Sequence, residues 1–208
     1  MFYWFYFISL VPSVVLHEVA HGYVANLFGD PTAKEQHRLT LNPLRHVDPF
    51  GTIIMPALLV FSHLPAFGYA KPVPVNPARM RNPRKQVLWM ALAGPAVNIV
   101  LSAVGFAYCE FEIRVVHTQN SNALLFGIAF GLVNLVLAVF NLLPIPPLDG
   151  SAVIERFIPM RHLPRYYHFR QRALPFFFIF LFLDYSFLHV GTNLLPDLEN
   201  WWVSLLIR

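Results

Sequence analysis

The chain has 208 residues, of which 56% are hydrophobic and only 12% charged, and its mean hydropathy is +0.52. A soluble globular domain carries about 25% charged residues, so this composition leaves too little polar surface to face water and predicts a membrane protein. The formal net charge is +4, but the basic residues are sorted between apolar stretches and form no binding stripe, so no nucleic-acid partner is expected. The single cysteine, Cys109, excludes an intrachain disulfide and is best interpreted as a buried packing residue.

Three apolar stretches, residues 2–28, 87–108 and 123–143, are long enough to cross a hydrocarbon core of about 30 Å. The first has no Lys or Arg before it and so lacks the basic start of a signal peptide, which predicts a retained helix. Residues 174–190 make a shorter fourth apolar stretch that is interrupted by Asp184. Residues 51–64 are apolar but contain Pro56, which favours a re-entrant or interfacial segment. The paired Trp residues in the short stretch 201–207 are typical of a membrane–water interface.

These segments predict an all-α polytopic membrane protein with about four to six transmembrane or re-entrant segments. We expect a single integral-membrane domain over 1–208, with a core over about 1–155 and C-terminal helices over about 156–208. The loops 30–86 and 144–173 hold 13 of the 15 Lys and Arg residues. Because positively charged loops stay in the cytoplasm, we expect the N-terminus outside and both loops inside, in a membrane taken to be the bacterial cell membrane.

The first apolar stretch contains the sequence His17-Glu18-Val19-Ala20-His21. An ionised residue at the centre of a spanning helix costs roughly 2.5 to 3.5 kcal/mol, so this cluster needs a partner such as a metal ion. At about 100° per residue, His17 and His21 lie about 40° apart on one helix face, where two imidazoles can converge on one ion. Glu18 projects beside them, where a carboxylate can hold a water bound to the metal. The alternative is that both histidines hydrogen-bond to neighbouring helices without metal.

A catalytic zinc usually has three protein ligands, so one more is required. The candidate is Asp149, which follows the 123–143 stretch in a proline-rich turn on the same predicted side of the membrane as His17 and His21. Asp149 could instead be the N-cap of a helix over 150–158. The rival third ligands are the other histidines, most of them in loops: His37, His46, His63, His117, His162, His168 and His189.

Small and polar residues recur at helical spacing in two of the predicted spans. One set is Gly127, Gly131, Asn134, Ala138 and Asn141, and the other is Gly94, Asn98 and Ser102. The glycines predict close helix packing, and Pro95 predicts a kink. Asn98 and Asn141 either bridge helices or face a watery site where they could hold a peptide backbone, whereas Asn134 favours bridging.

Taken together, three motifs resemble the site-2 protease family of intramembrane zinc metalloproteases, in its compact prokaryotic form. They are His-Glu-Val-Ala-His at 17–21, Gly-Pro-Ala-Val-Asn at 94–98 and Asn-Leu-Leu-Pro-Ile-Pro-Pro-Leu-Asp-Gly at 141–150. Residues 48–52 and 68–77 also resemble that group, so the likeness extends from residue 1 to about 155. The chain departs from many bacterial members of the family in lacking a PDZ or CBS domain.

The resemblance implies one zinc ion per chain held by His17, His21 and Asp149, with Glu18 as the general base and with Asn98 and Asn141 near the bound peptide. It also implies a membrane-dipping β-hairpin or sheet near residues 50–70. The expected partners are the lipid bilayer and membrane proteins that are cleaved within or near a transmembrane segment, and a homo-oligomer is left open. The alternative function is a zinc-binding membrane transporter or sensor without proteolysis, although the chain has no repeated halves of the kind common in transporters.

Overall fold

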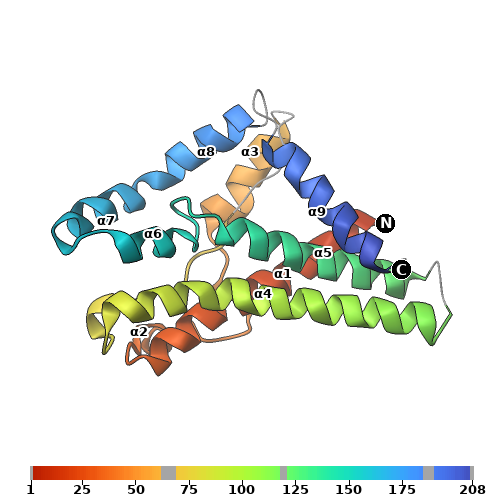
Figure 1. The fold of residues 1–208 in the computed structure, drawn as a ribbon, viewed down its shortest axis with the longest axis horizontal. Helices are drawn as coiled ribbons and strands as arrows, with labels where there is room; N and C mark the ends of the chain where they lie inside the picture. Colours follow the sequence, from red (N-terminus) through yellow and green to blue (C-terminus); the bar gives the residue numbers. More distant parts are fainter. Residues whose placement is uncertain (1, 62–68, 118–120, 185–189, 207–208) are drawn as a thin grey trace. The chain divides into compact units, whose positions relative to one another are not determined.

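The computed structural model describes residues 2–61, 69–117, 121–184 and 190–206, and throughout these residues the regular structure is helical (Figure 1). The longer helices are α1 (Phe2–Leu27), α4 (Pro83–Arg114), α5 (Asn122–Leu142), α8 (Ala173–Leu183) and α9 (Val190–Leu206). The shorter ones are α2 (Thr32–Glu35), η1 (Pro43–Arg45), η2 (Pro49–Ile54), α3 (Met55–Phe61), η3 (Pro77–Arg79), α6 (Ser151–Phe157), η4 (Met160–His162) and α7 (Leu163–Gln171).

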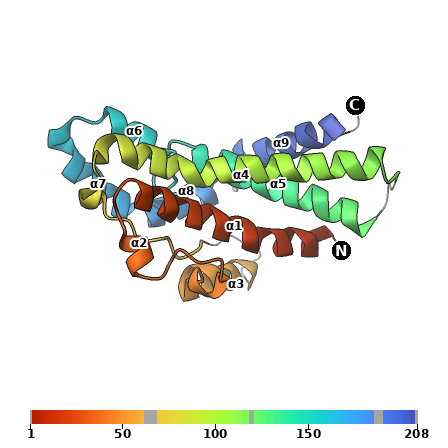
Figure 2. The ribbon, with the colours of Figure 1, turned by 90° about the horizontal axis from the view of Figure 1, so that it is seen from below.

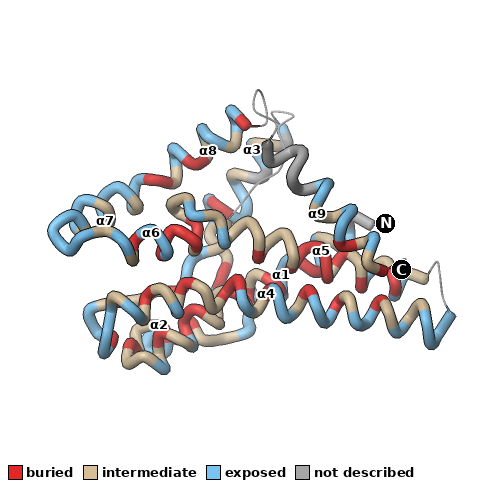
Figure 3. The backbone as a smooth tube through the Cα atoms, viewed as in Figure 1, coloured by how far each residue is buried: buried red, intermediate tan, exposed pale blue. Residues whose placement is uncertain are grey.

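Within the described part of the chain, three helices are long and apolar enough to cross a membrane: Trp4–Leu27, Pro83–Arg114 and Asn122–Leu142. They confirm the three predicted spans, and the second is longer at both ends than its apolar stretch. Along α4, buried and exposed positions alternate (Figure 3). Exposed positions of these spans carry large apolar side chains, among them Trp4, Phe7, Val104 and Phe111, as expected for helices that face lipid. The chain is thus an all-α, multi-pass membrane protein.

Two shorter apolar helices, Pro49–Leu59 and Ala173–Leu183, coincide with the predicted re-entrant segment and fourth stretch. Residues 49–61 are helical, so the β-hairpin expectation is wrong for this part of the 50–70 region. Asp48 explains the helical start, because its carboxylate accepts hydrogen bonds from the N–H groups of Phe50 and Gly51 at 3.1 and 2.7 Å, and Pro49 fits the first helical position. The rest of the predicted hairpin, residues 62–68, lies outside the described residues, as does His63.

The chain divides into two compact units, Val11–Gly94 and Met1–Leu10 with Pro95–Arg208. This division differs from the predicted boundary near residue 155, and the single-domain expectation stays a prediction. In the first unit, α1 ends at Leu27, and two residues later Gly29 has a positive φ of 103°, the left-handed conformation that glycine adopts without strain. Asn42 and Asn76 each accept a hydrogen bond from the N–H two residues on and start a 3₁₀ turn at the proline that follows.

In the second unit, the C-terminal half of α4 runs antiparallel beside α5 (Figures 1 and 2), and α9 packs on α5. A Cβ on Gly105 would lie 2.8 Å from the Cα of Gly131, and a Cβ on Gly131 would overlap the Trp202 ring. The predicted small-residue stripe is confirmed as a packing surface, since Gly127, Gly131, Asn134 and Ala138 are all buried.

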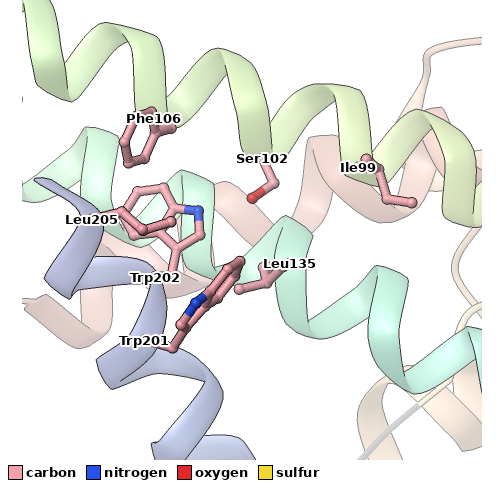
Figure 4. Close-up of a pocket in the computed structure, with 7 residues that line it drawn as sticks. All are labelled: Ile99, Ser102, Phe106, Leu135, Trp201, Trp202 and Leu205. Atoms are coloured by element: carbon pink, nitrogen blue, oxygen red, sulfur yellow. The ribbon is translucent and has the colours of Figure 1, made fainter.

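A buried apolar cluster lies among α4, α5 and α9. It contains Cys109, which has no exposed surface, next to Leu124, Leu132, Trp202 and Leu206. The interpretation of Cys109 as a packing residue is confirmed. Beside the cluster, α4, α5 and α9 line a mostly apolar hollow of about 220 Å³ (Figure 4). Its walls are Ile99, Ser102, Phe106, Leu135, Trp201, Trp202 and Leu205.

Candidate metal centre

The two histidines of the first helix converge, as their spacing predicts. Both side chains are buried, and their Nε2 atoms lie 3.0 Å apart with the ring planes at 83° to each other. Zinc binds imidazole nitrogen at about 2.0 to 2.1 Å, so two ligands at a tetrahedral angle are separated by about 3.3 Å. The observed separation is close to that value, and the donor set therefore fits a zinc ion.

The main chain of α4 orients one of these rings. His21 Nδ1 lies 2.8 Å from the carbonyl oxygen of Met90, and a carbonyl can only accept, so Nδ1 carries the proton and donates. The lone pair of His21 is then on Nε2, the atom that faces His17. In many metal sites, a hydrogen bond from the ring nitrogen that does not bind the metal fixes the tautomer and the orientation of the imidazole. Sequence reasoning missed Met90, because a main-chain carbonyl leaves no signature in the residue type.

Gly94 leaves the space in which the two imidazoles meet. A Cβ at this position would lie 2.5 Å from His21 Nε2 and 2.6 Å from His17 Nε2. Any larger residue would therefore push the two metal-binding nitrogens away. The sequence predicts Gly94 as a helix-packing residue, and the structure shows that it packs against the two imidazoles. The space that Gly94 leaves beside both Nε2 atoms is a second observation that these residues fit a metal ion.

The third predicted ligand, Asp149, follows α5 and belongs to the other compact unit. Among the described residues, His17, His21 and Asp149 offer a donor set of two imidazoles and one carboxylate that could hold a metal ion. The turn that carries Asp149 is fixed locally, since the Gly150 N–H donates to the Asn141 carbonyl at 2.7 Å. The alternative role of Asp149 is not observed, because the N-cap position of α6 is occupied by Gly150. His63 and His189, two of the rival ligands, lie outside the described residues.

Glu18 is half-buried, and one carboxylate oxygen accepts a hydrogen bond from the Val73 N–H at 3.0 Å. Glu18 follows His17 directly and is not part of the three-residue group, as expected of a residue that acts beside a metal and does not bind it. Val73 is a further contact that the sequence does not signal.

The two predicted substrate-binding asparagines have different surroundings. Asn98 has no exposed surface and donates to Asn134 Oδ1 at 2.7 Å, which makes it a bridge between α4 and α5. Asn134 bridges as predicted. Asn141 is half-buried and donates to the Leu137 carbonyl one turn earlier at 3.0 Å. A role for Asn98 and Asn141 in holding substrate stays a prediction.

A multi-pass helical fold whose first long apolar helix carries a buried His-Glu-x-x-His pair of histidines is typical of membrane-embedded metalloproteases. The profile of peptidase family M50 matches residues 5–113 and 111–183. The chain belongs to this family, the site-2 protease family.

Curated relatives agree with this assignment. The chain is 44% identical over 161 residues to YwhC, a candidate zinc metalloprotease of Bacillus subtilis, with 73% of this chain and 68% of YwhC covered. It is 32% identical over 144 residues to Rip2, a candidate zinc metalloprotease of Mycolicibacterium smegmatis, with 69% of this chain and 53% of Rip2 covered. It is 27% identical over 157 residues to the zinc metalloprotease MJ0392 of Methanocaldococcus jannaschii, of which it covers 35%. No solved structure matches the chain.

Proposed function

We propose that the protein is an intramembrane zinc endopeptidase that hydrolyses peptide bonds within or near transmembrane segments of membrane-protein substrates. The observation that carries the proposal is the pair of Nε2 atoms of His17 and His21, 3.0 Å apart inside a helix long and apolar enough to span a membrane. His17, His21 and Asp149 would hold one zinc ion per chain, and Glu18 would be the general base.

A bound zinc ion supplies a Lewis acid that polarises a peptide carbonyl and lowers the pKa of a water toward about 7. Glu18 would accept the proton of the attacking water and pass it to the leaving amine, since it follows His17 on α1 and lies within one turn of His21. Burial of His17 and His21 keeps both imidazoles away from bulk water. The Met90 carbonyl holds His21 in the tautomer whose unprotonated nitrogen is Nε2.

The substrate must present an extended stretch to this site, because a helical substrate hides its carbonyl groups in its own hydrogen bonds. Helix-breaking residues near the cleaved bond are therefore expected to favour cleavage. Asn98 and Asn141 are the proposed substrate-binding residues, and Asn98, which is fully buried, would have to become accessible in order to act. The proposed orientation has the N-terminus outside and the site toward the cytoplasm, as the basic loops indicate.

The test is cleavage of a panel of single-span membrane peptides by the full chain in liposomes, with the zinc content measured in the same samples. We expect a chelator to abolish cleavage and added zinc to restore it. The matched control is Glu18→Gln, which has the same size and is expected to keep zinc while losing cleavage by about a hundredfold or more. Full cleavage by Glu18→Gln with zinc bound would refute the general-base role. Stoichiometric zinc without cleavage by either form would favour the transporter or sensor function, and zinc flux would then be measured.

A further inference from the structure

Glu18 is held from outside its own helix. Its carboxylate accepts the N–H of Val73, 55 positions further along the chain. Val73 stands between Pro72 and Pro74, so it carries the only main-chain N–H in that tripeptide. In the stretch from Lys71 to Asn76 it is also the buried residue. The Pro72–Val73–Pro74 tripeptide therefore offers a single main-chain donor, and that donor is directed at Glu18.

The approach of this segment to α1 depends on a glycine. Gly22 lies four residues after Glu18 and so on the same helix face. A Cβ on Gly22 would lie 2.7 Å from Val73 Cγ1 and 2.6 Å from Leu39 Cδ2. The Val73 side chain thus fills the space above Gly22 while its N–H reaches the carboxylate one turn earlier.

One end of the 71–76 segment is fixed by a buried cation. Arg38 is only 8% exposed, and its Nη2 donates to the carbonyl oxygens of Lys71 at 2.9 Å and of Pro72 at 3.4 Å. The Lys71 N–H in turn donates to the carbonyl of His46 at 2.9 Å. A buried guanidinium is costly unless it is hydrogen-bonded, so these contacts couple the placement of Arg38 to that of the segment.

The other end is fixed by a buried anion. Asp30 has no exposed surface, and its Oδ2 accepts the Asn76 N–H at 2.6 Å, while its Oδ1 accepts from the N–H and the hydroxyl of Thr32. Arg79, three residues after Asn76, pairs with Glu35 of α2 at 2.6 Å. Buried or charge-assisted bonds therefore hold the segment on both sides of Val73.

We propose that the 71–76 segment is a positioning element for catalysis, in which the Val73 N–H holds the Glu18 carboxylate in place and Arg38 and Asp30 fix the segment. Its catalytic consequence rests on the proposed function. A proton acceptor that is already oriented needs no reorganisation when the reaction occurs, so the segment acts on turnover and not on zinc or substrate binding. Val73, Arg38 and Asp30 are positioning residues, since the reacting group they act through is Glu18.

The first experiment removes only the donor. Val73→Pro deletes the N–H, and Val73→Ala is the matched control that keeps it while trimming the side chain. For the peptide panel in liposomes, we expect Val73→Pro to lower kcat by about tenfold, the usual scale for one hydrogen bond to a charged group, with KM and zinc content unchanged. Val73→Ala keeps the donor, so its loss of kcat is expected to be clearly smaller than that of Val73→Pro. Equal kcat for Val73→Pro and Val73→Ala with zinc bound would overturn the proposal.

The second experiment needs no substrate. Hydrogen exchange of the Val73 amide, followed in valine-labelled full-length protein, should become at least about tenfold faster in Glu18→Ala, whereas Glu18→Gln keeps an acceptor oxygen and should change less. Exchange that is insensitive to Glu18→Ala would overturn the contact itself. If the native protein cleaves no peptide, the proposed function fails, and the exchange result still decides whether Val73 holds Glu18.

A third pair of variants covers the case in which Val73→Pro does not fold. Arg38→Met removes the bonds to the Lys71 and Pro72 carbonyls, and Arg38→Lys keeps one cationic donor. We expect Arg38→Met to speed exchange at Val73 and to lower kcat with zinc retained, and Arg38→Lys to restore part of both. A loss of zinc by Arg38→Met together with unchanged exchange at Val73 would assign Arg38 to the general stability of the unit and overturn its positioning role.

Discussion

The helices around Gly131 and the loops around Val73 are held together by different kinds of contact. In the first region, glycines of α4 and α5 and the ring of Trp202 fit together by shape, with one buried amide pair between the helices. In the second, Arg38 and Asp30 hold main-chain groups far away in the sequence. The packing of the membrane helices therefore depends on glycines that leave space at a few positions. The placement of the segment beside Glu18 depends on the charged side chains of Arg38 and Asp30.

The largest expected effect concerns the metal ligands. His21→Ala removes a nitrogen that is proposed to bind the metal, so zinc affinity should fall by more than about a hundredfold, which exceeds the loss from typical outer contacts. Competition with a chelating dye measures this. The control is His168→Ala on the exposed surface of α7, which should bind zinc as the native protein does. Equal zinc affinity for His21→Ala and the control would contradict the site.

Two glycine-to-alanine substitutions in α4, each of which adds one methyl group, test whether the metal site and the helix packing can be disturbed separately. Gly94→Ala places a Cβ against both metal-binding nitrogens, so zinc affinity should fall by about 10- to 100-fold. Gly105→Ala places it against the main chain of Gly131 instead, which should lower unfolding stability by about 1 to 3 kcal/mol with zinc affinity unchanged. Zinc titration and denaturation of both variants check this. If both lose zinc equally, the two regions are not separable in this way.

The buried amide pair gives a smaller effect. Asn98→Ala and Asn134→Ala, combined in a double-mutant cycle, should yield a coupling energy of about 0.6 kcal/mol and at most about 1.7 kcal/mol, the average and the maximum for hydrogen bonds between membrane helices. Unfolding in detergent measures the cycle. A coupling near zero would mean that the bridge adds nothing to helix packing, and would leave Asn98 free for the substrate role.

The sequence predicts the packing of the membrane helices better than it predicts the contacts of the loops. Long apolar stretches and the spacing of Gly127, Gly131 and Asn134 are properties of a regular helix, so the spans and their packing face could be predicted. His17 and His21 could be predicted because one helical turn brings them together. The contacts of Met90 and Val73 with the site could not, since each acts through its main chain, whose placement depends on tertiary structure. The resemblance implied a β-hairpin near residues 50–70, whereas residues 49–61 are helical, with the Asp48 carboxylate and Pro49 at the helix start.

The smallest expected effect is a pH dependence in the C-terminal helices. Burial first, and then the hydrogen bond to Glu155, raise the pKa of Tyr167 from 10.0 to about 12. Because the folded pKa is the higher one, the stabilisation from this group is complete below pH 10 and is lost as the pH rises toward 12. The hydroxyl donates to Glu155 at 2.6 Å, so its ionisation removes the bond and places two negative charges together.

The measurement is the difference in Tm between the native protein and Tyr167→Phe across this pH range. The difference should shrink from pH 9 to pH 12, since the variant has no hydroxyl to lose. Parallel Tm curves for the two proteins would show that Tyr167 contributes nothing to this dependence. The other tyrosines are shared by both proteins and cancel in the comparison.

The most direct test of the central claim is X-ray absorption at the zinc edge of the zinc-loaded full chain, compared with His21→Ala loaded in the same way. The account predicts a site with two imidazole nitrogens and oxygen ligands at about 2.0 to 2.2 Å and no sulfur, and the loss of one imidazole in the variant. A sulfur ligand, or a spectrum that His21→Ala leaves unchanged, would contradict a catalytic metal centre on the His17–His21 turn.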